Sequence, residues 1–253
     1  MEPQALTPLE QCSPDLYQVL RSVSECECDF ARRLTMGGLL RLVQEASTRH
    51  CTLLNITGED YRRTGTAFLL AKLCARIYTD IPAEAQVRLE TRPTLPIRAV
   101  YHRYTTLTFP GADSPAAAVD ARWVLVDIES RRILRRPPEG LHLPFTNPSV
   151  PEFPILIPKP QGEPEATGRE TAGYSRCDQN RHLNNTRYAD IICDHLPLEQ
   201  LRMGPLRELT ICYHRELPMG HTMEILRQET EPGLFYLAGR EGEQTCFEAA
   251  AVF

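Results

Sequence analysis

The sequence predicts the same order of elements twice, once on each side of a proline-rich stretch. Nine prolines lie between residues 137 and 164. Because proline cannot continue a helix or donate to a sheet ladder, this stretch predicts an extended connector. It separates about 135 residues from about 90, and both lengths are ordinary for domains. We therefore expect an N-terminal domain at residues 20–145, a linker at 137–164 and a C-terminal domain at 165–253.

The N-terminal half predicts one buried helix and several strands. Its patterns favour a strand over Ser22–Leu34 and a helix over Met36–His50 with Thr35 as N-cap. Apolar residues surround much of this helix, which indicates that it is well buried. After a polar bridge, strands are expected at Ala67–Tyr78, Gln86–Thr94, Arg98–Phe109 and Ala116–Ile128.

The C-terminal half repeats this order. We expect a strand over Gly168–Cys177 and then a helix from about Asn184 to Leu196, ended by Pro197. Further strands are expected at Glu208–Tyr213, Thr222–Glu229, Phe235–Glu241 and Thr245–Val252. One helix beside many strands predicts an α+β fold in which a mostly antiparallel sheet wraps around a helix, here doubled in one chain.

Composition limits the class of protein. Hydrophobic residues make up 42% and charged residues 24%, as in globular chains, and the net charge of −5 argues against nucleic-acid binding. No apolar run reaches the roughly 18 residues of a membrane span. Met1–Pro8 carries no signal-peptide pattern, so we expect a cytoplasmic protein. The nine cysteines form no C-x-x-C pair, which favours reduced thiols and no metal site.

The residues Asp178-Gln-Asn180-Arg-His182-Leu-Asn184-Asn185-Thr gather an acid, an imidazole and carboxamides ahead of an apolar helix pattern. Each of these residues alone has a structural interpretation. Asp178 can satisfy a turn and His182 can be a hydrogen-bonded structural histidine. The two adjacent asparagines can serve as helix cap and loop support. Asp190 and Asp194, four residues apart, are expected to form a solvated helix face.

Together these residues resemble the D-x-N-x-H-x-N-N signature of the hotdog-fold acyl-acyl carrier protein (acyl-ACP) thioesterases, bacterial and plant. The segment Leu209–Leu217 is similar to the family's strand with Y-R-R-E-C. The resemblance implies a double hotdog: two tandem hotdog domains, each an antiparallel sheet wrapped around a central helix. It also implies four catalytic residues: Asp178, Asn180, His182 and Glu216.

The resemblance implies hydrolysis of fatty acyl-ACP to free fatty acid and holo-ACP. Glu216 and His182 would position or deprotonate water. Asn180 and the N–H groups at the helix start would hold the carbonyl, and Asp178 would orient the loop. Leu217 stands where plant members have cysteine, which favours direct attack by water over an acyl-enzyme.

The N-terminal half resembles the family more weakly, through Leu39–Ala46, Tyr101–Phe109 and Ala121–Val124. Because it lacks an Asp-x-Asn-x-His run, we expect one active site per chain and an acyl-binding role for this half. The candidate substrate-binding residues are Leu39, Leu42, Val43, Phe68, Leu70, Trp123, Asn184 and Asn185.

The resemblance implies no metal or cofactor, because the substrate carries its own phosphopantetheine. Acyl carrier protein is the expected partner, nucleic acid is not, and a homodimer is a family-level expectation. The Arg131–Arg136 cluster favours a solvated turn, although it could dock the acidic carrier. Two alternatives remain: an acyl-CoA thioesterase of the same fold and a non-catalytic acyl-binding hotdog protein.

Overall fold

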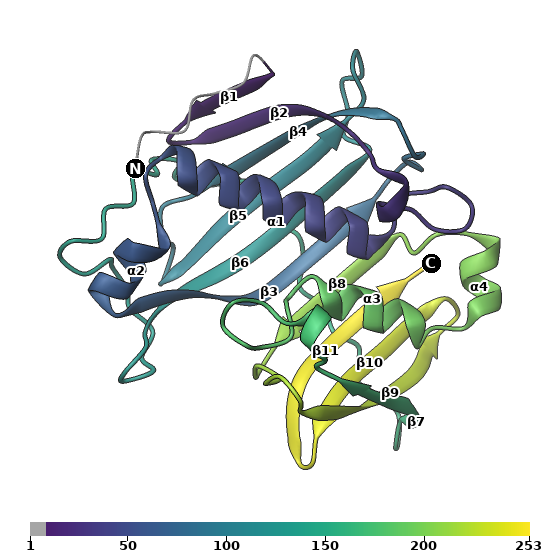
Figure 1. The fold of residues 1–253 in the computed structure, drawn as a ribbon. Coiled ribbons are helices and arrows are strands. Elements are labelled where there is room, and N and C mark those ends of the chain that lie inside the picture. Colours follow the sequence, from purple (N-terminus) through teal and green to yellow (C-terminus); the bar gives the residue numbers. More distant parts are fainter. Residues whose placement is uncertain (1–8) are drawn as a thin grey trace.

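The computed structural model describes residues 9–253, so the expectation about a signal peptide at Met1–Pro8 lies outside the described residues. Within them, one 11-stranded sheet has the order β1-β2-β4-β5-β6-β3-β8-β11-β10-β9-β7, and every neighbouring pair is antiparallel. The helices α1 and α3 lie side by side on one face (Figure 1). The predicted α+β class and antiparallel sheet are confirmed.

The strands of the N-terminal half are β1 (Glu10–Ser13), β2 (Leu16–Ser22), β3 (Thr66–Ile77), β4 (Gln86–Pro93), β5 (Val100–Thr108) and β6 (Ala117–Asp127). Those of the C-terminal half are β7 (Glu165–Thr171), β8 (Glu208–Tyr213), β9 (Thr222–Glu231), β10 (Leu234–Glu241) and β11 (Gln244–Val252). The helices are α1 (Met36–Leu53), α2 (Gly58–Thr64), α3 (Arg187–Asp194) and α4 (Leu198–Met203), with 3-10 turns η1 (Glu25–Glu27) and η2 (Tyr174–Arg176).

The long helix α1 forms where the sequence predicts it. The Thr35 side chain accepts a hydrogen bond from the Gly38 N–H at 2.9 Å, which satisfies one of the free donors at the helix start. Its apolar residues are buried against the sheet in a core that extends into the C-terminal half. The halves join where β3 pairs with β8, so they form one continuous structure. None of the helices in the described residues is long and apolar enough to span a membrane.

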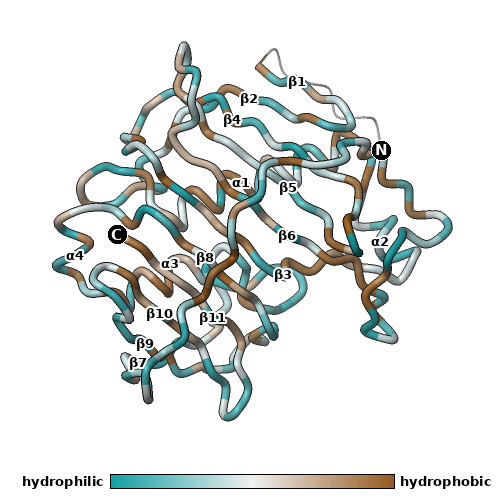
Figure 2. The backbone as a smooth tube through the Cα atoms, turned by 180° about the vertical axis from the view of Figure 1, so that it is seen from behind, coloured by the Kyte–Doolittle hydropathy of each residue, from teal (hydrophilic) through white to brown (hydrophobic). Residues whose placement is uncertain are grey.

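The proline-rich linker first passes the end of α1, where the Phe145 ring lies 6.4 Å from the His50 ring, and then crosses the sheet face opposite α1, at the back of the molecule (Figure 2). Phe153 packs beside Cys74 and Ala118, and its N–H donates to Asp120 Oδ2 at 3.0 Å. Farther along, Ile157 packs against a C-terminal cluster. The linker therefore covers apolar surface on both halves. The sheet of the first half begins at β1, ahead of residue 20.

Three predicted boundaries are wrong. The strand predicted over Ser22–Leu34 ends at Ser22, because Ser24 and Glu27 form a capping box that starts η1. The strand predicted over Gly168–Cys177 lies earlier, at β7, and is followed by η2. The second helix begins at Arg187, because the Asn184 side chain accepts from the Thr186 N–H at 2.9 Å and holds a turn there. The strand β1 and the short helices α2 and α4 were not predicted.

Candidate active site

The residues of the polar motif lie on a tight loop at residues 177–184, between η2 and α3. The loop closes through hydrogen bonds from the Asp178 N–H to the His182 carbonyl and from the Arg181 N–H to the Asp178 carbonyl, both at 3.0 Å. Asp178 Oδ1 also accepts from the Asn180 N–H at 2.8 Å. Asp178 therefore orders the loop that carries Asn180 and His182, and the Asn180 side chain is exposed.

His182 and Glu216 come together although they are distant in sequence. The Leu183 N–H donates to the Leu217 carbonyl at 2.9 Å, and His182 forms an isolated bridge with Pro218. These contacts bring the loop to the end of β8 and place His182 Nδ1 3.3 Å from Glu216 Oε2. The pair lacks hydrogen-bond geometry, and His182 Nδ1 is buried with no hydrogen-bond partner among the described residues. An imidazole and a carboxylate at this separation can together orient a water molecule.

The start of α3, with its partial positive charge, follows directly after this loop. Its N-cap, Thr186, makes no side-chain cap hydrogen bond. The Asn185 carbonyl accepts a hydrogen bond from the Tyr213 hydroxyl at 3.0 Å, which ties the residues before α3 to the end of β8. The first-turn N–H groups of a helix lack partners within the helix and carry partial positive charge. At α3 the Thr186 and Arg187 N–H groups already donate at 2.9 Å to Asn184 Oδ1 and to the Asn184 carbonyl, so the positive end of the helix dipole, rather than these two donors, can stabilise an oxyanion near Thr186.

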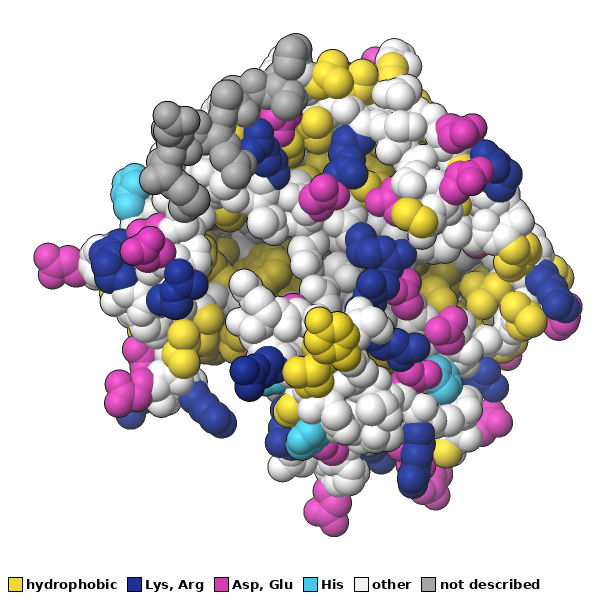
Figure 3. Space-filling view, in the orientation of Figure 1, with side chains coloured by type: hydrophobic (Ala, Val, Ile, Leu, Met, Phe, Trp, Pro, Cys, Tyr) yellow, Lys and Arg dark blue, Asp and Glu magenta, His cyan; other side chains and the backbone are white. Residues whose placement is uncertain are grey.

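Two cavities meet beside Thr186. A groove of about 920 Å³ runs over the outer side of α1, and its lining includes Arg41, Cys177, Asn184 and Thr186. A smaller pocket of about 30 Å³ lies between α1 and the sheet and shares Gln44 and Thr186 with the groove. Figure 3 shows hydrophobic side chains at the bottom of hollows on this face. The residues lining these cavities do not include Asp178, Asn180, His182 or Glu216, although Cys177 and Asn184 at the two ends of the loop border the groove.

Of the predicted substrate-binding residues, four line the inner pocket: Val43, Leu70, Trp123 and Asn185. Asn184 lines the outer groove instead. Leu39 and Leu42 are buried in the core and do not line the pocket, while Phe68 packs against Tyr101. The helix contributes Leu40, Val43, Gln44 and Ser47 to the pocket. This is the i, i+3, i+4, i+7 spacing of one helix face, so the pattern could have identified Leu40.

The N-terminal half contains a second loop of the same construction, which the sequence analysis missed. The loops at residues 28–34 and 177–183 both read Cys-Asp-x-x-Arg-x-Leu. In each, the Asp carboxylate accepts from the N–H two residues later at 2.8 Å, and the Asp N–H donates to the carbonyl four residues later. The arginine has a positive φ of 60° in one loop and 62° in the other. The shared Cys-Asp-x-x-Arg-x-Leu spacing was the signal that could have found this copy.

The two loops differ in the groups expected to do chemistry. Ala31, Arg33 and Asp80 stand where the C-terminal half has Asn180, His182 and Glu216. Arg33 donates from Nε and Nη2 to Asp29 Oδ2 at 3.1 and 2.9 Å. A guanidinium held by a carboxylate is always protonated and cannot act as a base. The structural copy therefore carries no second set of candidate catalytic groups.

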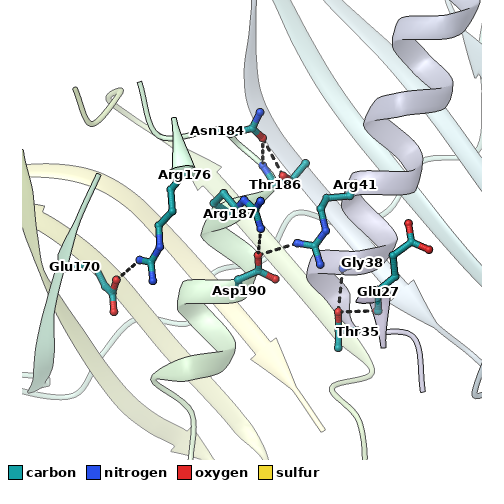
Figure 4. Close-up of polar contacts among 10 residues, drawn as sticks. All are labelled: Glu27, Thr35, Gly38, Arg41, Glu170, Arg176, Asn184, Thr186, Arg187 and Asp190. Atoms are coloured by element: carbon teal, nitrogen blue, oxygen red, sulfur yellow. Dashed lines mark hydrogen bonds and ion pairs between the residues drawn. The ribbon is translucent and has the colours of Figure 1, made fainter. Parts of the chain in front are cut away.

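An ion pair joins α1 and α3 next to the groove. Asp190 Oδ2 accepts from Arg41 Nη1 at 2.7 Å and from Arg187 Nη1 at 3.2 Å (Figure 4). The expectation that Asp190 belongs to a solvated face is wrong, because α1 lies against it. Asp194 is exposed, as expected, and desolvation, with Glu170 and Asp190 adding to it, raises the pKa of its carboxyl group.

The cysteines near the loop are poor candidates for a nucleophile. Burial raises the pKa of the Cys177 and Cys212 thiols, whereas a nucleophilic cysteine needs a lowered pKa. Leu217, which follows Glu216, is fully buried. Among the described residues, no group of three or more His, Cys, Asp or Glu is arranged to hold a metal ion. The expectation that no metal takes part stays a prediction.

Comparisons with known proteins agree with this architecture. The family model for the acyl-ACP thioesterase C-terminal domain matches residues 169–249. An acyl-ACP thioesterase structure from Bacteroides thetaiotaomicron is 18% identical, with a TM-score of 0.82 over 94% of this chain and 97% of that one. The 12:0-ACP thioesterase from Umbellularia californica is 16% identical, with a TM-score of 0.84 over 98% of each chain. No curated protein sequence matches the chain. The predicted double hotdog fold is confirmed.

Proposed function

We propose that this chain, whose C-terminal domain belongs to the acyl-ACP thioesterase C-terminal domain family, hydrolyses fatty acyl-ACP to free fatty acid and holo-ACP. The observation that carries the proposal is the approach of His182 Nδ1 to Glu216 Oε2 at 3.3 Å, on the loop that has the family's motif. An imidazole beside a carboxylate, close to the positive end of a helix dipole, is an arrangement suited to ester and thioester hydrolysis.

The proposed reaction begins with a water molecule held by His182 and Glu216. One of the two groups takes the proton as the oxygen attacks the thioester carbon, and the tetrahedral oxyanion forms. Asn180 donates to that oxyanion, and the positive end of the α3 dipole stabilises its charge. The carbon–sulfur bond then breaks and the thiolate leaves. A thiol has a pKa of roughly 8.5, so the thiolate needs little help from an acid.

The two cavities suggest how the substrate lies. The inner pocket, with Leu40, Val43, Leu70 and Trp123, is apolar, but its volume of about 30 Å³ holds only one or two water-sized groups, so an acyl chain enters there only if α1 and the sheet move apart. The outer groove is suited to the phosphopantetheine arm that the carrier brings, so no separate cofactor is needed. We place the enzyme in the cytoplasm as a homodimer. The exposed turn at Arg131–Arg136 remains a candidate for docking the acidic carrier protein.

Thiol release from acyl-ACP and acyl-CoA, measured side by side, tests this function. We expect acyl-ACP to be hydrolysed with the higher kcat/KM. Glu216→Gln and His182→Ala should each lower kcat by about 10²- to 10⁴-fold. Asp80→Asn is the matched control, since Asp80 has the equivalent position in the other loop, and it should retain full turnover.

Two results would redirect the proposal. A higher kcat/KM for acyl-CoA would identify an acyl-CoA thioesterase of the same fold. Binding of acyl chains with no thiol release from either substrate would identify a non-catalytic acyl-binding protein. Equal losses from Asp80→Asn and Glu216→Gln would mean that neither carboxylate acts on the substrate directly.

A further inference from the structure

One carboxylate beside the outer groove is shared by two arginines. Arg41 of α1 and Arg187 of α3 both line the groove, and their Nη1 atoms lie 2.7 and 3.2 Å from the same oxygen, Asp190 Oδ2 (Figure 4). Each guanidinium is positively charged at every physiological pH, whereas the carboxylate carries a single negative charge. These three residues, which we call the arginine cluster, therefore have one positive charge in excess.

The other arginines that line the groove have a carboxylate each. Asp194, the next acid along α3, does not line the groove. The excess positive charge of the groove is therefore concentrated at the arginine cluster, where an anion would be attracted most strongly. Each of the three other arginines forms an ion pair with its own glutamate: Arg21 with Glu45, Arg49 with Glu10 and Arg176 with Glu170.

The guanidinium groups of the cluster can bind a ligand as well as Asp190. The side chains of Arg41 and Arg187 are 29% and 38% exposed, so solvent reaches both. A guanidinium has several N–H donors, and within the described residues each of these two arginines uses one of them, on Asp190. Two guanidinium groups that converge from different helices suit a phosphate, which accepts several hydrogen bonds at once.

The distance from the cluster to the candidate catalytic loop suits the phosphate of a pantetheine arm. About 13 bonds separate the phosphorus from the sulfur of that arm, and a chain with peptide bond lengths spans roughly 15 Å over them. Arg187 follows His182 by five residues, which span at most about 18 Å when fully extended. A phosphate at the cluster therefore leaves the thioester within reach of His182 and Glu216.

We propose that Arg41 and Arg187 bind the phosphate of the substrate's pantetheine arm in the outer groove. The inference rests on the proposed thioesterase function and names the part of the substrate that this groove recognises. The groove, with a volume of about 920 Å³, has room for the arm. Asp190 holds both guanidinium groups in place before the substrate arrives, so less side-chain freedom is lost on binding.

The test compares two thioesters that differ only in the phosphate, octanoyl-phosphopantetheine and octanoyl-pantetheine. Thiol release gives kcat/KM for each, and the ratio of the two values is the phosphate preference. We expect the wild type to prefer the phosphorylated arm by about fivefold or more at low salt, through KM. Added salt should reduce this preference, because it screens the charges. Phosphopantetheine should likewise inhibit hydrolysis of acyl-ACP more strongly than pantetheine does.

Four variants locate the phosphate. Arg41→Gln and Arg187→Gln should each reduce the phosphate preference severalfold, whereas Asp190→Asn, which removes the competing negative charge, should increase it. Arg21→Gln is the matched control, because it removes the same charge from another arginine of the groove, and it should leave the preference unchanged. Both thioesters are measured on one preparation of each variant, so a partly unfolded variant still gives a valid ratio.

Two results would overturn the proposal. Equal kcat/KM values for the two thioesters in the wild type, with equal inhibition by the two free arms, would show that the phosphate is not recognised. An equal loss of preference in Arg21→Gln and in Arg41→Gln would show a diffuse attraction instead of a binding site. Loss of hydrolysis for both thioesters and for acyl-ACP would instead refute the proposed function.

Discussion

Asp29 and Asp178 hold equivalent positions in the two halves, and each accepts a hydrogen bond at 2.8 Å from the backbone N–H two residues later. Their further contacts differ. Asp29 also accepts from the Arg33 N–H at 2.9 Å and binds the Arg33 guanidinium. The residue equivalent to Arg33 is His182, which lies beside Glu216 instead. The same turn is thus locked in one half and presents an imidazole in the other.

This difference predicts opposite effects of alanine at the two positions. Asp29→Ala removes four hydrogen bonds, two of them to a guanidinium, and should lower the free energy of unfolding by about 1–3 kcal/mol with kcat preserved. Asp178→Ala loosens the loop that carries His182, so it should lower kcat by at least about tenfold with a smaller loss of stability. Urea unfolding and steady-state turnover measured on both variants separate the effects. Equal kcat values for the two variants would contradict the assignment.

Gly37 is required where α1 meets α3. A Cβ there would lie 1.7 Å from Asp190 Oδ1, and the carboxylate cannot move freely because Arg41 and Arg187 hold it. Gly37→Ala should therefore lower the free energy of unfolding by about 1–3 kcal/mol. Gly58→Ala in α2 is the matched control. Its Cβ would meet only Arg62 Nη1, at 3.5 Å, and alanine is the better helix former. Urea midpoints of the two variants check this, and equal midpoints would show that the helices can separate without cost.

The sequence predicted the parts of the fold whose patterns are long. Helix α1 and the strands around it follow clear periodicities, and Thr35 caps α1 as expected. The boundaries are misplaced where side-chain hydrogen bonds override the apolar pattern. Ser24 and Glu27 cap a 3-10 turn within a stretch that alternates like a strand. The Asn184 side chain holds a turn, so α3 begins later than predicted. Patterns of apolar residues do not register such side-chain-to-backbone bonds, which decide where an element starts.

At the candidate site, the motif led to His182 and Glu216, and the structure places them together. The copy at residues 28–34 was not predicted because it lacks the His and Asn of the motif. The feature that the two loops share is the hydrogen bond from a backbone N–H to the aspartate carboxylate. The pocket residue Leu40 was missed because apolar side chains lie on most sides of the first turns of α1, between Leu39 and Val43. Which apolar residue faces a pocket depends on the packing of β3 and β6 against the helix.

The residue after Glu216 offers a test of the water mechanism. Leu217 is fully buried, so Leu217→Cys should place a thiol in the core rather than at the site. Burial keeps thiols protonated and unreactive, so no acyl-enzyme should form. The variant should lose about 1–3 kcal/mol of stability from the smaller side chain, and kcat should change by less than about threefold. Mass spectrometry of rapidly quenched reactions checks for an acyl adduct, and an adduct on residue 217 would refute direct attack by water.

His50 predicts a pH dependence of stability that is independent of catalysis. It is fully buried at the end of α1, where Nε2 lies 2.8 Å from the Ser13 carbonyl and Nδ1 lies 3.1 Å from Arg103 Nη1. Nε2 therefore donates and Nδ1 accepts, which is the neutral tautomer. Burial, and after it the charge of Arg103, lowers the pKa of His50 to about 4, against smaller opposing effects of the hydrogen bond to the Ser13 carbonyl and of Asp15.

Because the pKa of His50 is lower in the folded state than the unfolded value near 6.5, the unfolded chain binds the proton more readily. The neutral imidazole contributes fully to the free energy of unfolding above about pH 6.5, and this contribution is lost as the pH falls toward 4. It amounts to roughly 3 kcal/mol at most. Urea unfolding between pH 7.5 and 4.5 should show this decline, and His50→Gln, which keeps a donor for Ser13, should flatten it. His214→Gln is the exposed control. A wild-type slope that survives in His50→Gln would assign the decline to other groups.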